Sequence, residues 1–364
     1  MPRRPRLIHL VSSTFWGGRE QYALDICRAF AREGWNVTVL SRDAKAVDTP
    51  FQQGGVTVRH MSLGAYSDIT SIFRLARMLR RAPTPPAVHA HNFRDAFVAL
   101  CARRLSLCGG VRVVLTCHRV KPGRNTPLRR RIMRGLDALV FPSALTRDTF
   151  LSTWRGKQPP LGPHKIHVLL NSVYLPDTGP DTAPAGPVTA AYHGRLVRGK
   201  GLETLIEALP ALRGLRTRVC IAGTGDPDYT DTLKRQATRL QVMDMIDWSV
   251  NAPGRESILE RAHIGVFPSL MPEAFGLGGA ACMALGLPQV CSDNGAQGEY
   301  LTDGREALLV PPGDSGALAD ALRRLATDPA LRQTMGHAAR ERFERQLSWP
   351  RFAGALEDIY LGRP

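Results

Sequence analysis

Short apolar runs alternate with helical patterns along almost the whole chain. Residues 6–11 form an apolar run, Gly17 and Gly18 make a turn, residues 19–33 carry apolar side chains at helical spacing, and residues 36–40 form a second run. A strand, a turn, a helix and a strand in this order make a βαβ unit, in which the two strands are parallel. The alternation therefore predicts an α/β fold built on parallel sheets.

The alternation restarts after a segment that is too rich in proline and glycine for regular structure. This segment, residues 175–187, reads LPDTGPDTAPAGP, and we interpret it as a linker. Because 364 residues exceed what one hydrophobic core usually supports, we expect two domains, at 1–174 and 188–348. A last amphipathic helix is expected at 349–360.

The apolar pattern predicts the position of each element. The first domain should contain strands at 6–11, 36–40, 56–60, 87–91, 111–116, 138–142 and 166–170, and helices at 19–33, 69–81, 96–105 and 126–134. The second should contain strands at 188–192, 218–222, 245–249, 264–268 and 308–310, and helices at 202–212, 229–240, 257–262, 317–327 and 331–343.

Positive charge is concentrated in the first half. Residues 1–175 hold 28 Lys and Arg against nine Asp and Glu, a net charge of +19, whereas the remainder carries −3. Such a half predicts a polyanionic partner, and an anionic membrane surface, a phosphorylated glycan and nucleic acid are the candidates. Nucleic acid is disfavoured because the arginines lack interleaved aromatic side chains. An arginine excess that serves only solubility is the alternative.

One basic segment offers two interpretations. Residues 121–134, KPGRNTPLRRRIMR, predict a helix with arginines around Leu128, Ile132 and Met133. Its apolar side can lie on an anionic bilayer or pack into the core, and the sequence leaves both open.

The cysteines and the apolar runs indicate a cytoplasmic protein. The seven cysteines are scattered and form no C-x-x-C pair, which is typical of reduced thiols in the cytosol. The apolar run at 7–11 is too short for a signal peptide. The sequence contains no run of about 18 apolar residues, so it predicts no membrane-spanning helix.

Several strand ends carry residues suited to ligand binding, and in a parallel sheet these ends share one edge. A dinucleotide site is disfavoured, because the first turn offers only Gly17 and Gly18 and the second strand ends without an acid. His89, His91 and Asn92 end one strand, and His118 follows the next. A lone histidine is usually structural, but two strand ends with histidine favour a function.

The second domain carries a candidate diphosphate site. Arg195 and Lys200 leave one strand end together with Gly194, Gly199 and Gly201, so that cations and backbone amides can approach the same anion. Solvated loop cations are the alternative.

A carboxylate precedes a second glycine-rich helix start in this domain. Glu273 precedes Phe275, Gly276 and Leu277 at the start of a helix, which suits a ligand with hydroxyls and phosphates. Asp226 and Asp228 make only a weak acid pair, and no Cys/His spacing predicts zinc, so no metal is expected.

Taken together, these motifs resemble the retaining GT-B glycosyltransferases of the glycosyltransferase 4 group. The resemblance covers nearly the whole chain. It rests on Gly17-Gly18-Arg19-Glu20, His89-Ala90-His91-Asn92, Thr116-Cys117-His118, Gly194-Arg195-Leu196, Lys200-Gly201, Phe267-Pro268-Ser269, Glu273-Ala274-Phe275-Gly276-Leu277, Met283-Ala284-Leu285-Gly286-Leu287-Pro288 and Gly295 to Glu299.

The resemblance implies two Rossmann-like domains that face each other across a cleft, the first completed by the C-terminal helix 349–364. It implies transfer of a sugar from a nucleoside diphosphate sugar to a glycan or lipid-linked acceptor, with the anomeric configuration retained and without metal or other cofactor. The implied setting is surface polysaccharide or lipopolysaccharide biosynthesis. We expect the basic half to bind the inner face of the membrane peripherally.

The resemblance also implies a role for each candidate residue. Glu273 would hold hydroxyls of the donor sugar, Arg195 and Lys200 would neutralise the diphosphate, and His118 would lie beside the reacting sugar. The remaining donor-side positions would be Gly17, Gly18, Gly194, Phe275, Gly276, Leu277 and Ala281, and the acceptor-side or sugar-proximal positions His89, His91 and Asn92.

One position departs from the family pattern. A second glutamate, eight residues after the first, usually contacts the ribose, and here that position is Ala281. Loss of a charged acceptor predicts nucleotide binding weaker by roughly 1.5–3 kcal/mol. Another residue could hold the ribose, the enzyme could bind its donor weakly, or the chain could be a degenerate subunit without activity. A phosphorylase or nucleotide-sugar epimerase activity is a further alternative, but Arg195, Lys200, Glu273 and His118 favour an active transferase.

Overall fold

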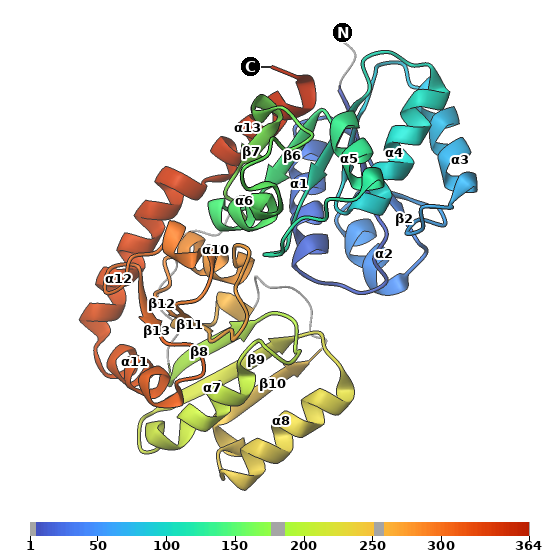
Figure 1. Cartoon of the computed structure of the whole chain (residues 1–364). Coiled ribbons are helices and arrows are strands. Elements are labelled where there is room, and N and C mark those ends of the chain that lie inside the picture. Colours follow the sequence, from blue (N-terminus) through green and yellow to red (C-terminus); the bar gives the residue numbers. More distant parts are fainter. Residues whose placement is uncertain (1–4, 176–185, 251–257, 364) are drawn as a thin grey trace. The chain divides into compact units, whose positions relative to one another are not determined.

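The computed structural model describes residues 5–175, 186–250 and 258–363, and the chain forms two compact units (Figure 1). Unit 1 comprises Met1–Tyr174 together with Trp349–Pro364, and unit 2 comprises Leu175–Ser348. The last helix of the chain therefore belongs to the first unit. None of the helices within the described ranges combines the length and the apolar character needed to span a bilayer.

Unit 1 is built on a seven-stranded parallel sheet with the order β3-β2-β1-β4-β5-β6-β7. Its strands are β1 Arg6–Val11, β2 Asn36–Ser41, β3 Thr57–His60, β4 Ala87–Ala90, β5 Arg112–Thr116, β6 Ala138–Phe141 and β7 Ile166–Val168. Its helices are α1 Gly18–Arg32, α2 Lys45–Gln53, α3 Ile69–Arg80, α4 Phe93–Ser106, α5 Pro127–Gly135, α6 Ala144–Leu151 and α13 Trp349–Leu361.

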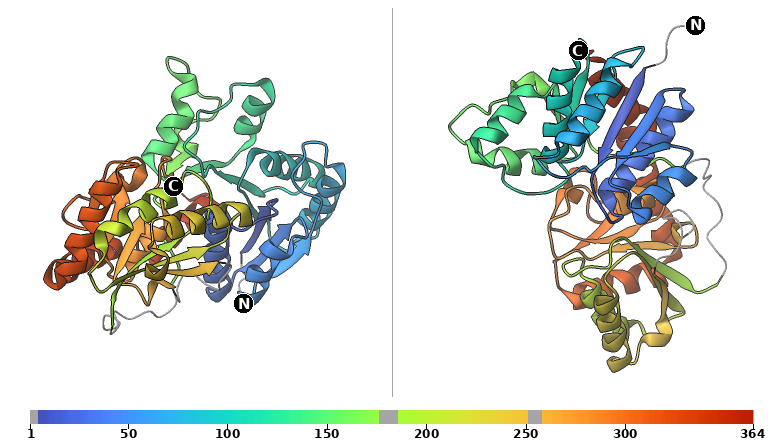
Figure 2. Two further views of the ribbon diagram at one scale, coloured as in Figure 1. Left: turned by 90° about the horizontal axis from the view of Figure 1, so that it is seen from below. Right: turned by 90° about the vertical axis from the view of Figure 1, so that its right-hand side faces the viewer.

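Helices cover the sheet of unit 1 in two sets. Buried side chains of α3, α4, α5 and α6 form one core cluster with the strands. The aromatic rings of α1 instead contact those of α13, with centroids 5.9 Å apart for Tyr22 and Phe352 and 5.6 Å apart for Phe30 and Tyr360. The ribbon of α13, in red, lies against unit 1 (Figure 1), and the right-hand view of Figure 2 shows the same.

Unit 2 repeats this architecture on a six-stranded parallel sheet with the order β10-β9-β8-β11-β12-β13. Its strands are β8 Val188–His193, β9 Thr217–Gly223, β10 Ile246–Val250, β11 Ile264–Phe267, β12 Gln289–Ser292 and β13 Ala307–Val310. Its described helices are α7 Leu202–Ala208, α8 Pro227–Arg239, α10 Leu277–Ala284, α11 Ser315–Thr327 and α12 Pro329–Arg342.

The predicted α/β fold with two parallel sheets is confirmed, and each strand given bounds above lies within two residues of its observed position. Two helices differ. Helix α4 begins at Phe93 and not at 96, because the Asn92 side chain caps it. Helix α2 was not predicted at all, since Pro50 inside it is typical of a loop. The helix predicted at 257–262 lies partly outside the described residues.

Candidate functional site

Three loops meet at the carboxyl ends of β8, β11 and β12 in unit 2, which are neighbours in the sheet. The Gly199 carbonyl oxygen accepts hydrogen bonds from the backbone N–H groups of Leu270 at 2.9 Å and Met271 at 3.2 Å. The Glu273 carbonyl oxygen accepts one from Ala296 at 2.9 Å. These bonds join the loops into one surface and fix the backbone around Glu273.

Glycine is required where two of these loops touch. Gly201 has φ +71°, and a Cβ there would lie 1.7 Å from the Pro268 carbonyl oxygen. A Cβ on Gly295 would lie 2.5 Å from the Glu273 backbone nitrogen. Because these distances are far below van der Waals contact, a side chain at either position would push the loops apart.

The three predicted donor-side charged residues lie on these joined loops. Lys200 Nζ donates a hydrogen bond to Glu273 Oε1, and both side chains are largely buried, with 19% and 20% exposure. Arg195 is half-buried on the same loop as Lys200, and its guanidinium forms no ion pair with any of the residues that the structure describes. The hydrogen bond from Lys200 thus holds the Glu273 carboxylate in place, and the Arg195 guanidinium lies on the same loop.

Helix α10 begins beside Glu273. Gly276 is its N-cap with φ +96°, so the first N–H groups of the helix, from Leu277 onward, have no carbonyl partner within the helix. The backbone before the cap is fixed by Tyr300, whose hydroxyl donates to the Phe275 carbonyl at 2.5 Å. Sequence reasoning missed Tyr300, because a single buried tyrosine between loops has no recognisable spacing.

The position of the missing second glutamate is closed to solvent. Ala281 lies inside α10 and is fully buried. It offers no polar atom to a ribose, and a longer side chain there would have to displace its neighbours.

The first glycine loop lies in unit 1 at the start of α1. Gly17 is the N-cap in an extended conformation, with φ −166°. The Ser13 hydroxyl donates to Glu20 Oε1 at 2.6 Å, and Arg19 Nε donates to the same oxygen at 2.7 Å. The turn at Gly17 and Gly18 is therefore closed by a buried carboxylate of α1.

Four histidines cluster in unit 1, one more than the sequence had singled out. His118 Nε2 lies 3.1 Å from His91 Nδ1, and His91 Nε2 lies 2.9 Å from Nδ1 of His9, the residue that was missed. Burial lowers the pKa of His9 and of His118 to about 3, and holds the pKa of His89 and His91 well below the ordinary range. All four rings are therefore neutral at pH 7.

Two of the predicted acceptor-side residues serve the fold in this structure. His89 is fully buried and pairs with the Tyr360 hydroxyl at 2.7 Å and with Thr116 Oγ1 at 2.8 Å. The Asn92 side chain accepts from the backbone N–H groups of Arg94 and Asp95 at the start of α4. His91 and His118 remain the histidines that approach the sheet edge.

The structure decides between the two interpretations of the basic segment. Ile132 and Met133 of α5 are buried in the core of unit 1, so most of the apolar side of this helix packs inward, and only Leu128 of the three apolar residues is exposed, at 38%. Arg131 and Arg134 are exposed, and the Arg129 guanidinium lies 3.9 Å from the centre of the Phe93 ring.

Two groups among the described residues have the side-chain geometry for a metal ion. They are His9, His89 and His91, which are buried, and Asp43, Asp48 and His60 at the surface. Neither group contains a residue of the donor-side loops. Asp226, from the weak Asp226/Asp228 pair, caps α8: its side chain accepts a hydrogen bond from the backbone N–H of Asp228 at 3.0 Å.

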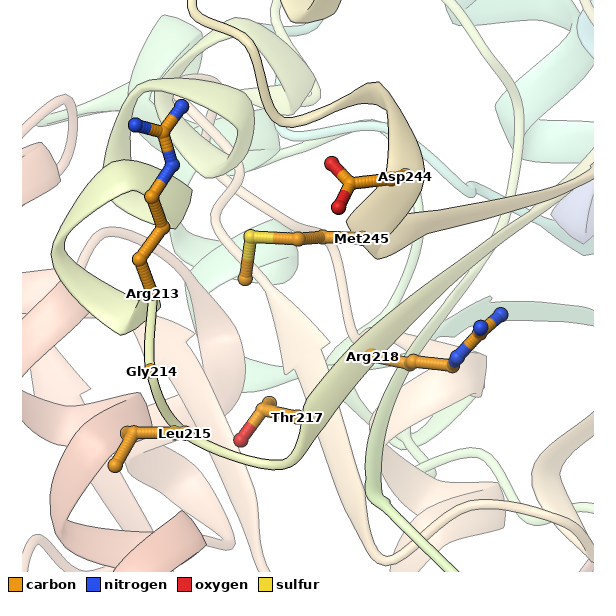
Figure 3. Close-up of a pocket in the computed structure, with 7 residues that line it drawn as sticks. All are labelled: Arg213, Gly214, Leu215, Thr217, Arg218, Asp244 and Met245. Carbon is orange, nitrogen blue, oxygen red and sulfur yellow. The ribbon is translucent and has the colours of Figure 1, made fainter.

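A separate pocket of about 340 Å³ lies at the amino ends of β9 and β10 (Figure 3). Arg213, Arg218 and Asp244 supply its charged side chains. It contains none of the predicted site residues, and it lies at the opposite end of the strands from the loops described above.

Comparison with known proteins gives two family matches that together span most of the chain. Residues 17–172 match a glycosyl transferase 4-like domain, and residues 180–342 match the glycosyl transferases group 1.

Named relatives agree with these matches. The glycogen synthase of Mycobacterium tuberculosis is 30% identical over 298 residues, covering 77% of this chain and 70% of that protein. The alpha-maltose-1-phosphate synthase of Mycolicibacterium smegmatis is 28% identical, with 82% and 84% covered.

Solved structures share the fold. The Anabaena protein HepE, crystallised with UDP and glucose, superposes with a TM-score of 0.79 over 98% of this chain and 99% of that chain, at 17% identity. Two parallel-sheet units, the two matched domains and the relatives together show that this chain is a glycosyltransferase of the group 1 family, with the GT-B fold.

Proposed function

We propose that this glycosyltransferase moves a hexose-like sugar from a nucleoside diphosphate sugar to a glycan or lipid-linked acceptor, with retention of configuration and without a metal ion. The observation that carries the proposal is the position of Arg195, Lys200 and Glu273 on joined loops beside the start of α10. The structure of HepE with UDP and glucose supports the choice of a nucleotide-sugar donor.

The chemistry follows from where charge develops. A departing diphosphate gains negative charge in the transition state, and fixed cations and a helix N-terminus stabilise such charge. Arg195 and Lys200 supply the positive charge that a metal ion would otherwise supply, and the Glu273 carboxylate accepts hydrogen bonds from sugar hydroxyls. Transfer then proceeds on one face of the sugar without a protein nucleophile.

A panel of nucleotide sugars tests this proposal. We expect one donor to raise the melting temperature and to yield a product of retained configuration in the presence of EDTA. Arg195→Met, Lys200→Met and Glu273→Gln should each lower kcat/KM by about 100-fold or more. Arg218→Met, an exposed arginine paired with Asp247 at 3.1 Å, is the matched control and should leave kcat/KM unchanged.

Other results of the same panel would contradict the proposal in distinct ways. Absence of nucleotide binding by calorimetry would indicate a non-catalytic subunit. Release of a sugar phosphate from a glycan would indicate a phosphorylase, and an isomerised nucleotide sugar an epimerase. Loss of transfer on EDTA treatment, restored by a divalent cation, would contradict the metal-free mechanism.

Two acceptor classes are supported by different observations. The relatives named glycogen synthase and alpha-maltose-1-phosphate synthase favour a glucan or a sugar phosphate. The net charge of +19 over residues 1–175 favours a lipid-linked glycan of surface polysaccharide or lipopolysaccharide biosynthesis at an anionic cytoplasmic membrane face. We propose the second class, because a surface on α3 fits a bilayer better than α5 does.

The α3 surface combines exposed apolar side chains with arginines. Ile69 and Phe73 are 63% and 61% exposed, which is unusual for large apolar residues on a helix. Residues 69–81 contain no acidic side chain. We define the α3 surface as Ile69, Phe73, Arg74, Arg77 and Arg80, all of them exposed. Apolar side chains that insert between anionic headgroups contacted by arginine would hold unit 1 peripherally on the membrane.

Co-sedimentation with vesicles tests the α3 surface. We expect binding to anionic vesicles that weakens with salt, and little binding to neutral ones. Ile69→Ser with Phe73→Ser should abolish most of it, and Arg77→Gln should weaken it about fivefold. Met243→Ser, an exposed apolar residue of unit 2 at 38% exposure, is the control. Binding that ignores salt and lipid charge would contradict the proposal.

A further inference from the structure

A chain of histidine rings runs from the sheet edge into the core of unit 1. His118 lies just beyond β5, His91 just beyond β4, and His9 inside β1. His118 Nε2 and His91 Nδ1 are 3.1 Å apart, and His91 Nε2 and His9 Nδ1 are 2.9 Å apart. His91 thus uses both ring nitrogens to connect its two neighbours. His89 lies beside this chain but bonds to Thr116 and Tyr360 instead.

The chain is packed so that its rings keep their orientation. The Tyr22 ring lies edge-on to His118 at 4.9 Å and to His91 at 5.8 Å between centroids. His9 and His91 are stacked at 5.2 Å. His9 is fully buried and His91 is 4% exposed, whereas His118 is only partly buried. Only one end of the chain can therefore meet a ligand.

Both hydrogen bonds of His91 must run in the same direction. Burial depresses the pKa of all three rings, so each is neutral and carries one N–H and one bare nitrogen. If His91 donates to His118, it accepts from His9, and if it accepts from His118, it donates to His9. Only these two arrangements satisfy both bonds.

The buried end of the chain distinguishes the two arrangements. His9 Nε2 is buried and has no hydrogen-bond partner among the described residues. If the bonds ran from His118 to His9, this nitrogen would carry a buried N–H without an acceptor, which is rare and costly in proteins. If they run from His9 to His118, only a lone pair is left there.

We infer that His9 and His91 are positioning residues that hold His118 in the tautomer with its proton on Nδ1. His118 Nδ1–H is then a fixed hydrogen-bond donor at the sheet edge. This inference rests on the proposed function only in placing the reacting sugar at that donor. A partly exposed histidine without such neighbours would exchange its proton between both nitrogens.

Nuclear magnetic resonance on the full chain with labelled histidine tests the tautomer without any substrate. Long-range proton–nitrogen correlations identify which ring nitrogen of each neutral histidine is protonated. We expect His118, His91 and His9 all to be protonated on Nδ1, with His118→Gln providing the assignment of His118. Protonation of His118 on Nε2, or averaged signals from both tautomers, would overturn the inference even if the chain proves to be an active transferase.

Two substitutions of His9 test the consequence for catalysis. His9→Phe keeps a ring but removes the donor, so we expect averaged tautomers at His118 and a kcat about tenfold lower, with KM for the donor almost unchanged. His9→Asn retains an N–H near the Nδ1 position and should restore both readouts. A merely structural role of His9 would lower the melting temperature and leave the His118 tautomer as it is. If His9→Phe fails to fold, the wild-type spectrum still decides.

Discussion

Single glycines determine how closely the loops around Glu273 approach one another. At Gly201 the backbone has φ +71°, and the Pro268 carbonyl oxygen occupies the place where a Cβ would be. At Gly214 the backbone has φ +81°, but no atom lies within 4 Å of a Cβ. An alanine would therefore meet similar backbone strain at both positions, but only at Gly201 would its Cβ also collide with a neighbouring atom.

This pair gives a prediction with an internal control. Gly201→Ala should destabilise unit 2 by about 3 kcal/mol or more and weaken donor binding, because the Lys200 loop must move away from Pro268. Gly214→Ala should cost only about 1 kcal/mol and leave donor binding intact. Thermal unfolding and calorimetry with the donor measure both effects. Equal effects of the two substitutions would show that strain and not loop contact matters at Gly201.

At this scale the sequence could predict residues that stand in recognisable motifs. Arg195, Lys200 and Glu273 were placed on one site surface in advance, and the structure brings them onto joined loops. His9 and Tyr300 were not found, because each acts through one long-range hydrogen bond. Such a bond is set by strand register and loop packing, which no local spacing records.

Among the elements, α13 shows how a distant segment completes a core. Its Tyr360 is buried against Phe30 and donates or accepts a 2.7 Å hydrogen bond with the buried His89 ring. Arg112 Nε also donates to the Ile359 carbonyl at 3.1 Å. The helix is thus attached to the sheet of unit 1 by polar as well as apolar contacts.

Removal of one hydroxyl tests this attachment. Tyr360→Phe leaves a ring nitrogen of His89 buried without a partner, so the free energy of unfolding of unit 1 should fall by about 1–2 kcal/mol. Tyr174→Phe removes a hydroxyl that accepts from Arg32 at 2.7 Å on the surface, and should change it by less than about 0.5 kcal/mol. Chemical denaturation compares the two. A Tyr360→Phe protein as stable as the wild type would contradict the role of this bond.

Element type was predictable where the apolar pattern was strong and failed where it was weak. The strands β1, β4 and β6 are short but almost entirely buried, so their apolar runs stand out. Helix α2 has only three buried residues, Val47, Asp48 and Phe51, and it contains Pro50. Tertiary packing against α1 and β3 stabilises it, and this packing is invisible to a local pattern.

Across the whole molecule, the histidine cluster makes unit 1 sensitive to acid. The folded pKa values lie near 3 for His9 and His118, against about 6.5 in the unfolded chain. Below about pH 6.5 the unfolded chain binds protons that the folded unit does not, so stability falls as the pH drops toward 3. Burial raises the pKa of Asp95 to about 6, so between about pH 6 and 4 the folded unit binds a proton there that the unfolded chain does not. This proton offsets the destabilising effect of one histidine over that range.

We therefore expect unit 1 to lose stability between pH 7 and pH 5, by up to about 1.4 kcal/mol per pH unit for each uncompensated histidine. No such change should occur between pH 7 and pH 8. Hydrogen exchange at several pH values resolves the two units, and peptides of unit 1 should lose protection first. Equal loss in both units, or constant protection down to pH 5, would contradict the assignment of neutral buried rings.

Because unit 1 is completed by α13, the order of synthesis does not match the order of packing. All of unit 2 is synthesised before Phe352, Leu356 and Tyr360 are added. Until then the sheet of unit 1 lacks the helix that buries His89 and Phe30. The apolar face that α13 covers therefore stays exposed on the nascent first unit, which favours chaperone binding. For the same reason, a chain that lacks its last helix should be prone to aggregate.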